Sequence, residues 1–145
     1  MQTAVLLYPG FTALDAVGPY ETLVQLPDSE TVFVAERPGP VRCDSGRLSL
    51  VAEKGLDEVT RPDVVVVPGG PHPETEMDNP AVLDWLRTVD ATTTWTTSVC
   101  TGSLLLAAGG GGRAPPPPRP RAPAPPPPPR AGIHQDQPPT PRGNW

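Results

Sequence analysis

Cysteines and long apolar runs are both scarce in this chain of 145 residues, and each scarcity excludes a class of protein. No apolar run approaches the roughly 20 residues that a membrane-spanning helix needs, so we expect no membrane partner. The two cysteines, Cys43 and Cys100, are far apart and match no metal-ligand spacing, which predicts two free thiols and no metal site. The N-terminus lacks the basic stretch and the longer apolar core of a secretion signal. We therefore expect a cytoplasmic protein in a reducing compartment.

Basic residues are scarce in residues 1–108, which contain six lysines and arginines but fifteen aspartates and glutamates. An acidic surface disfavours the phosphate backbone of nucleic acids, so we expect no nucleic-acid partner. From residue 109 onward the balance reverses, with five arginines against Asp136 alone. The charge pattern therefore divides the chain at about this point.

Large apolar residues are almost absent after residue 108. Residues 109–145 contain 14 of the 24 prolines, and their only large apolar residues are Ile133 and Trp145. Such a segment cannot bury enough apolar surface to offset the entropy of ordering. We therefore predict one domain over residues 1–108 and a disordered tail over residues 109–145. Because the tail repeats the P-x-x-P pattern with flanking arginines, an alternative is a ligand for an SH3-type groove.

Residues 1–108 alternate between strand-like and helix-like segments. Short apolar or β-branched runs predict strands over residues 3–8, 31–36, 47–53, 63–70 and 92–99. Between them we expect a helix that begins near Pro19, a second with Asn79 as its N-cap and Pro80 in its first turn, and a third that starts at Thr101. This alternation predicts an α/β fold, a parallel sheet with helices on both faces. In such a sheet reactive groups gather beyond the carboxyl ends of the strands.

Cys100 stands between the last predicted strand and the last predicted helix. A sharp strand-to-helix turn exposes a nucleophile, and the free N–H groups of the helix favour a thiolate there. Gly102 would relieve crowding in such a turn. The competing interpretation is a small buried cysteine that only packs, and the position of Cys100 is compatible with both.

Two other segments bring candidate groups to the same edge of the sheet. Gly69 and Gly70 follow a buried strand, and their N–H groups, with that of Thr101, suit a pocket for developing negative charge. Asp15 and Glu21 offer carboxylates for passing protons or for binding the hydrogen-bond partner of a thiolate. Taken singly, each of these residues is explained more simply by an ordinary turn or a helix cap.

Three segments, "YPGFTALDAVGPYETL", "DVVVVPGGP" and "SVCTGSLLLAA", resemble in this order the ThiJ/PfpI superfamily. The forms "LDxxGPxE" and "SVCTG" are most similar to its isonitrile hydratase branch. The resemblance covers residues 1–108 and implies a flavodoxin-like sandwich of the class I glutamine amidotransferase type. It implies that Cys100 is the nucleophile, that Asp15 is the acid beside it, and that Thr101 orients water and substrate. It also implies that Gly70 and the Thr101 backbone stabilise an anion, while Glu21 is an acid whose role differs among relatives.

The chemistry that the resemblance implies is hydration of an isonitrile, R–N≡C, to an N-substituted formamide. This lyase reaction uses no metal and no organic cofactor, and its partner is a small-molecule electrophile. Relatives tend to be dimers, so a homodimer is also implied. Two alternatives stay open: a non-catalytic sensor domain of the kind found in arabinose-regulator-type transcription regulators, and glyoxalase or deglycase action on α-oxoaldehydes. No helix-turn-helix pattern follows Ala108, which counts against a complete regulator.

The sequence departs from the family pattern after Ala108. Relatives continue with further strands and covering helices, whereas this chain turns to glycine and then to proline and arginine, which have GC-rich codons. Our hypothesis is a reading-frame shift near Gly109, and the other two frames of the gene should then encode a family-like second half. The fold would be truncated after the elbow helix, with the elbow strand at an exposed edge. The burial lost by exposing this strand is large compared with a net domain stability of only about 5–15 kcal/mol. We therefore expect impaired activity.

Overall fold

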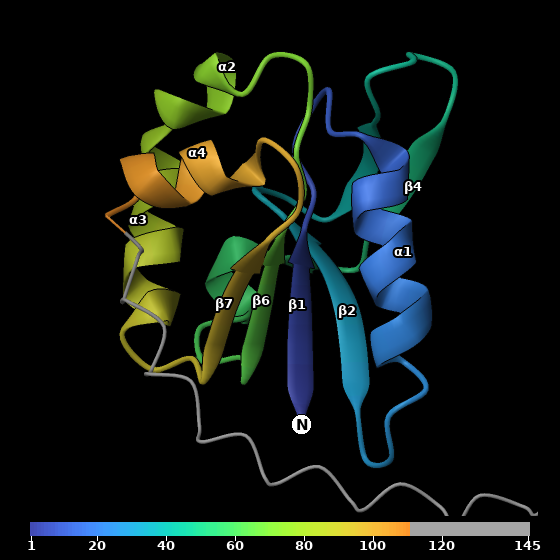
Figure 1. Cartoon of the computed structure of the whole chain (residues 1–145), viewed down its shortest axis with the longest axis vertical. Coiled ribbons are helices and arrows are strands. Elements are labelled where there is room, and N and C mark those ends of the chain that lie inside the picture. Colours follow the sequence, from blue (N-terminus) through green and yellow to red (C-terminus); the bar gives the residue numbers. More distant parts are fainter. Residues whose placement is uncertain (111–145) are drawn as a thin grey trace, which may run out of the picture. The chain divides into compact units, whose positions relative to one another are not determined.

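The structure, a computed structural model, describes residues 1–110 (Figure 1). The tail was predicted over residues 109–145, as a disordered segment or an SH3 ligand. Its first two residues, Gly109 and Gly110, are described and form the turn that ends the last helix, and residues 111–145 lie outside the described residues. Within residues 1–110, none of the helices has the length and apolar character needed to cross a membrane.

A five-stranded parallel sheet forms the centre of the described chain (Figure 1). Its strands lie in the order β5-β2-β1-β6-β7, and the β2-β1-β6-β7 part is the flavodoxin-like order. This confirms the predicted α/β class. The strands are β1 (Gln2–Leu6), β2 (Glu30–Ala35), β5 (Lys54–Gly55), β6 (Val64–Val67) and β7 (Trp95–Ser98).

Helices cover both faces of the sheet, as predicted. The connections from β1 to β2 and from β6 to β7 run in opposite directions, so right-handed crossovers place their helices on opposite faces. In Figure 1, α1 lies on one side, and α2, α3 and α4 lie on the other. The helices are α1 (Ala13–Leu23), α2 (Glu74–Met77), α3 (Pro80–Asp90) and α4 (Gly102–Ala108), and a short 3-10 turn spans Leu56–Glu58.

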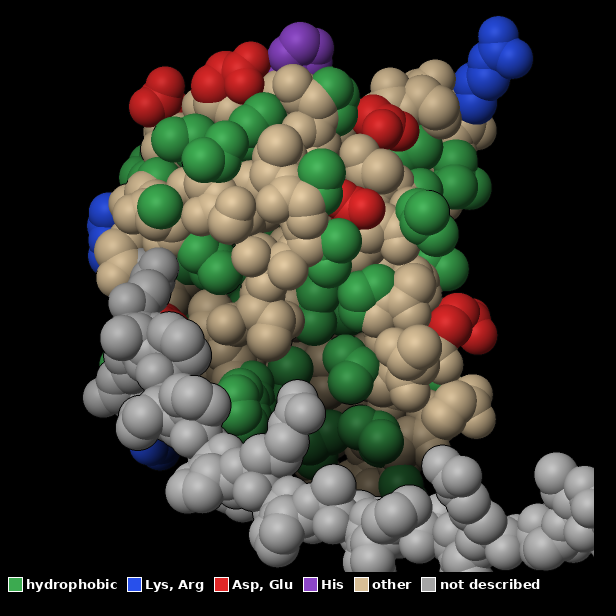
Figure 2. All heavy atoms as spheres, viewed as in Figure 1, with side chains coloured by type: hydrophobic (Ala, Val, Ile, Leu, Met, Phe, Trp, Pro, Cys, Tyr) green, Lys and Arg blue, Asp and Glu red, His purple; other side chains and the backbone are tan. Residues whose placement is uncertain are grey.

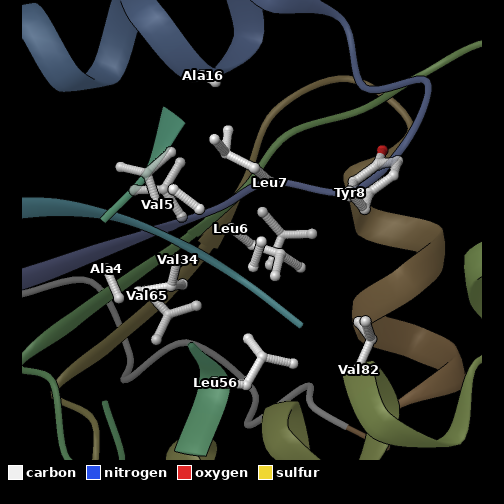
Figure 3. Close-up of a cluster of buried hydrophobic side chains, with 14 of the residues drawn as sticks. Ala4, Val5, Leu6, Leu7, Tyr8, Ala16, Val34, Leu56, Val65 and Val82 are labelled. Carbon is white, nitrogen blue, oxygen red and sulfur yellow. The ribbon is translucent and has the colours of Figure 1, made fainter. Parts of the chain in front are cut away.

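The hydrophobic core lies between the helices and the two central strands. Because β1 and β6 have neighbours on both edges and helices near both faces, their side chains are buried on both sides, as expected for apolar runs in a parallel sheet. Side chains of both helical layers meet them in Figure 3, which includes Ala16 of α1 and Val82 of α3.

Helix α3 begins where the sequence predicted. Asn79 is its N-cap, with the side-chain Oδ1 accepting from the N–H of Ala81 at 3.1 Å, and Pro80 is the first helical residue. The indole N–H of Trp85 donates to the carbonyl of Val59 at 2.8 Å in the interior. This bond ties α3 to the segment that precedes β6.

Helix α1 corrects one prediction, because it begins at Ala13 and contains Pro19 in its interior. A proline there cannot donate to the carbonyl of Asp15 and costs a helix about 3 kcal/mol. In its first turn Leu14 is 75% exposed, while Ala16 is fully buried. Packing of the first turn against the sheet therefore outweighs the local penalty, and it carries Asp15 to the edge of the sheet.

A hairpin outside the main sheet accounts for the strand predicted over residues 47–53. Strands β3 (Gly39–Arg42) and β4 (Ser49–Ala52) pair with each other in antiparallel fashion. Strand β3 is an element that the sequence did not predict. Glycine and proline are both rare inside strands, and Pro40 cannot donate to a ladder, so the residues Gly39 and Pro40 do not indicate a strand. In the structure Gly39 has a φ of 131°, which glycine adopts readily.

Strand β7 is the last strand of the described sheet and pairs there with β6 alone. Trp95 is 56% exposed, and its side chain borders an open groove of about 650 Å³ between β7 and α1, which Pro19, Leu23 and Leu26 also line. Hydrophobic side chains are visible in this hollow in Figure 2. The expected exposure of the elbow strand is therefore present within residues 1–110.

Candidate active site

The carboxyl ends of β1, β6 and β7 meet at one edge of the sheet, because these strands are adjacent and parallel. A loop follows each strand, over residues 7–12, 68–73 and 99–101. Val67 pairs with Ser98 in the last step of the β6–β7 ladder, so the last two loops leave the sheet side by side. The three motifs identified in the sequence are therefore brought together.

Cys100 joins β7 to α4 in a left-handed backbone conformation, with a φ of 54°. Such a conformation costs a non-glycine residue of order 1–3 kcal/mol and persists where its surroundings hold it. The Val99 N–H donates to the Val67 carbonyl and the Gly102 N–H donates to the Val99 carbonyl, both at 3.0 Å. These bonds fix the chain on both sides of the cysteine. Cys100 is exposed, which does not fit the competing interpretation of a buried packing cysteine.

Glycines allow the loop after β6 to approach this elbow closely. A Cβ atom on Gly69 would lie 2.9 Å from the Cβ of Cys100 and 2.7 Å from the backbone nitrogen of Thr101. A Cβ atom on Gly102 would collide with the backbone of Val67 and Pro68. Only glycine permits these approaches, so Gly69 lies directly against Cys100.

The Thr101 hydroxyl forms two hydrogen bonds with Gly70, the second glycine of the loop, one as donor and one as acceptor. Its Oγ1 donates to the carbonyl of Gly70 at 2.8 Å and accepts from the N–H of Gly70 at 3.0 Å. The N–H that the resemblance assigns to anion stabilisation is therefore directed at the Thr101 hydroxyl in this structure. The bonds join the loop of β6 to the elbow of β7.

Asp15 reaches the first glycine from the other side. Its Oδ2 accepts from the N–H of Gly69 at 3.2 Å, and the carbonyl of Gly69 accepts from the N–H of Thr12 at 2.8 Å. The early start of α1 makes this contact possible, because it puts Asp15 in the first turn of the helix. Asp15 and Cys100 thus contact the same glycine.

Tyr8 is a further member of this cluster, which the sequence did not predict. Its side chain is 2% exposed, and its hydroxyl donates to the carbonyl of Pro68 at 2.9 Å. Burial, and then the charges of Glu76, Asp15 and Cys100, raise the pKa of the phenol, so it remains a donor. Figure 3 shows Tyr8 in the loop after β1. An aromatic residue at the end of an apolar strand is ordinary in a sequence, and nothing local marks its distant partner.

The β3–β4 hairpin braces the loop that carries Tyr8. The Gly10 N–H donates to the carbonyl of Arg42 and the Asp44 N–H donates to the carbonyl of Phe11, both at 2.9 Å. The Thr12 hydroxyl donates to the carboxylate of Asp44 at 3.0 Å. The hairpin therefore helps to hold the start of α1, and with it Asp15.

The remaining carboxylate and the loop histidine are not part of the cluster. Glu21 is exposed on α1, beyond Pro19, and among residues 1–110 it makes no hydrogen bond to the other candidate residues. His72 is also exposed, and its Nδ1 lies 3.1 Å from a carboxylate oxygen of Glu74. The structure therefore brings together Asp15, Gly69, Gly70, Cys100 and Thr101, but not Glu21.

Two further titratable groups lie outside the cluster. Glu76 is 5% exposed, beside a cleft of about 510 Å³, and burial, followed by the nearby Glu36 carboxylate, raises its pKa. Cys43 is buried, and a hydrogen bond with Ser45 at 3.2 Å lowers the pKa of its thiol. Within residues 1–110, no three histidine, cysteine, aspartate or glutamate side chains converge as metal ligands would.

The chain is similar in sequence to proteins of a known family. The sequence matches the DJ-1/PfpI family over residues 1–114. An isonitrile hydratase of Pseudomonas putida is 37% identical over 105 residues, which is 72% of this chain and 46% of that protein. The chain therefore spans about half the length of this curated relative.

Solved structures extend the similarity to three dimensions. A ThiJ/PfpI family protein from Pseudomonas syringae is 32% identical and superposes with a TM-score of 0.72, covering 76% of this chain and 46% of that one. DJ-1beta of Drosophila melanogaster, 21% identical, superposes with a TM-score of 0.68 over 77% of this chain and 61% of its own, which supports the fold alone. By its sequence match and its fold, the chain belongs to the DJ-1/PfpI family.

Proposed function

We propose that the cluster around Cys100 is the site of a cysteine-dependent hydration of an isonitrile to an N-substituted formamide. The observation that carries the proposal is the contact of Asp15 and Cys100 with the same residue, Gly69. An exposed thiol with a carboxylate close by is the arrangement that nucleophilic catalysis with proton transfer needs. The 37% identity to an isonitrile hydratase supports this reaction over others available to an elbow cysteine.

The proposed reaction balances with these two groups and one water. The Cys100 thiolate forms a C–S bond to the terminal carbon of R–N≡C, and the carboxylic acid of Asp15 gives that carbon a proton, which yields a thioimidate, R–N=CH–S–. Water adds across the C=N bond, placing OH on carbon and H on nitrogen. The C–S bond then breaks and the OH proton passes to the Asp15 carboxylate. The product is R–NH–CHO, and both groups return to their starting states.

Thr101 and the glycine loop have supporting roles in this proposal. The backbone N–H of Thr101 lies at the elbow beside Gly69, where a donor can stabilise charge that develops on the substrate. The Thr101 hydroxyl, which bonds Gly70 in both directions, holds that loop and can exchange one of these bonds for water. A small-molecule substrate and, by analogy with relatives, a homodimer belong to the same proposal.

The test is turnover of cyclohexyl isocyanide by the 145-residue chain, followed as formation of N-cyclohexylformamide. We expect turnover that is lost in Cys100→Ala and retained in Cys43→Ser, because the second thiol is buried and its hydrogen bond is with Ser45, which is outside the cluster. Asp15→Asn should reduce kcat more than it changes KM. Equal turnover by the parent and Cys100→Ala would overturn the proposal.

Two further outcomes separate the alternatives. Lactate formation from methylglyoxal, without formamide formation from the isonitrile, would favour action on α-oxoaldehydes. A folded chain, verified by circular dichroism, that transforms neither compound would favour the sensor interpretation.

A further inference from the structure

One peptide unit at the candidate site is held at both of its polar ends. The carbonyl of Pro68 accepts from the hydroxyl of Tyr8 at 2.9 Å. The N–H of the same peptide, on Gly69, donates to Oδ2 of Asp15 at 3.2 Å. Because a peptide bond is planar, fixing its carbonyl also fixes the direction of its N–H.

The next peptide is held in the same way by other groups. The Gly69 carbonyl accepts from the Thr12 N–H, and the Gly70 N–H donates to the Thr101 hydroxyl. Of the side chains that hold these two peptides, Tyr8 is the one to which neither the sequence nor the proposed reaction gives a role. It is also the most buried of them, and its ring packs edge-on against Phe11, with ring centroids 6.5 Å apart.

We propose that Tyr8 is a positioning residue that acts through the Pro68–Gly69 peptide: its hydroxyl directs the Gly69 N–H at Asp15 and so holds the Asp15 carboxylate beside Cys100. The inference deepens the proposed function and rests on it for its effect on turnover. Its structural content, the coupling of Tyr8 to Asp15, does not depend on which reaction the site performs.

Removing only the hydroxyl of Tyr8 removes its hydrogen bond to the carbonyl of Pro68. In Tyr8→Phe the ring still fills its place, but the carbonyl of Pro68 loses its donor in a buried position, which costs about 1–3 kcal/mol unless the peptide turns away to find another. A peptide that turns carries the Gly69 N–H away from Asp15. The ionised carboxylate then loses a charge-assisted hydrogen bond.

The direct test is the pH titration of the Gly69 amide by NMR in the 145-residue chain. In the parent, we expect the Gly69 amide resonance to move as Asp15 takes up a proton, and Asp15→Asn should abolish this movement. In Tyr8→Phe the movement should shrink roughly twofold or more, because the charge-assisted bond that produces it is weakened. A titration of unchanged size and midpoint in Tyr8→Phe would overturn the proposal.

Tyr20 provides the matched control. It is a tyrosine on α1 that stacks on Phe33 with ring centroids 4.7 Å apart, and within residues 1–110 its hydroxyl makes no hydrogen bond to the glycine loop. Tyr20→Phe removes the same atom and should leave the Gly69 titration unchanged. An equal loss in both variants would mean a general loosening of the fold, which would contradict a specific role for Tyr8.

A second measurement keeps the inference testable if Tyr8→Phe does not fold. Coupling between two sites is reciprocal, so protonation of Asp15 must also be felt at Tyr8. With 3-fluorotyrosine incorporated into the otherwise unchanged chain, the fluorine signal of residue 8 should shift with pH, and Asp15→Asn should remove the Asp15 component. A fluorine signal that titrates identically with and without Asp15 would overturn the proposal.

Turnover separates this inference from the proposed function. If the chain hydrates the isonitrile, Tyr8→Phe should lower kcat about tenfold with KM nearly unchanged, the upper range for loss of one neutral hydrogen bond. If the chain hydrates no isonitrile, the proposed function fails while the NMR titration still decides the role of Tyr8.

Discussion

Strands β6 and β7 are neighbours in one sheet and lead into the glycine loop and the elbow of the candidate site, yet they are built differently. Every residue of β6 is a valine, and their exposed fractions lie between 0% and 7%. The first residue of β7, Trp95, is paired in register with Val64 and is 56% exposed. The glycine loop therefore follows a strand buried on both faces, whereas the elbow follows a strand at the edge of the described sheet.

The two strands are held in place by different interactions. Hydrophobic burial holds β6, but the elbow is held by bonds to β6 and its loop: Val99 to Val67, and Thr101 to Gly70. Helix α4 adds one fully buried side chain, Leu105. The geometry of Cys100 is thus imposed largely from the β6 side, and substitutions can test this directly.

The largest effect is expected where the elbow packs against β6 and its loop. In Gly102→Ala the new methyl group would overlap the backbone of Val67 and Pro68, which cannot move aside as a flexible side chain could. We expect a loss of about 3 kcal/mol or more in the free energy of unfolding, at the upper end of overpacking penalties. Urea denaturation followed by circular dichroism measures it.

Gly18→Ala is the control for this substitution. Gly18 lies inside α1 with open space where its Cβ would be, so alanine should stabilise the chain by about 0.5–1 kcal/mol. Similar unfolding curves for the two variants would mean that α4 does not pack on β6 as described.

The second prediction compares a registered pair, Val66 of β6 and Thr97 of β7. Val66 is 2% exposed, so Val66→Ala should cost about 2–3 kcal/mol through lost burial and a cavity. Thr97→Ala removes a hydrogen bond to the carbonyl of Val65 and should cost about 1 kcal/mol or less. Equal losses in thermal or urea unfolding would erase the distinction between the two strands.

A smaller gain is expected at the elbow itself. Cys100 has a positive φ that glycine adopts without strain, so Cys100→Gly should be more stable than Cys100→Ala by about 0.5–1 kcal/mol, after allowance for the greater freedom of unfolded glycine. The two variants differ by one methyl group, and paired denaturation curves compare them. If alanine proved the more stable residue, the elbow would hold no strain.

The smallest effect is a pH dependence of stability, and it comes from Glu76 in α2, the helix that follows the loop of β6. Burial, with Glu36 nearby, raises the pKa of Glu76, so between the unfolded value of about 4.3 and the higher folded value the folded chain binds more protons. Stability should therefore fall as pH rises through this window. In Glu76→Gln, which can still accept the bond from Asn79, that contribution should vanish. Thermal unfolding across the window measures the difference, and parallel pH profiles would contradict it.

The sequence predicted the elements better than their starting points. Valine runs and the Asn79-Pro80 pair identified β6 and α3, because burial and capping leave local patterns. Cys100, Thr101 and the glycine pair were identified by their place after predicted strands. The predicted start of α1 was wrong. Proline usually marks the first turn of a helix, but tertiary packing extends α1 to Ala13 and leaves Pro19 in its interior.

The sequence by itself determined the alternation of strands and helices, the parallel sheet and the motifs that meet at its carboxyl edge. Periodicity, turn residues and apolar runs act within a few residues, and they are readable without coordinates. Only the tertiary structure decided that Tyr8 and Asp15 hold opposite ends of one peptide, and that Glu21 stands apart. These contacts join residues 60 and 54 positions apart in the chain, and hydrogen bonds over such separations leave no local pattern.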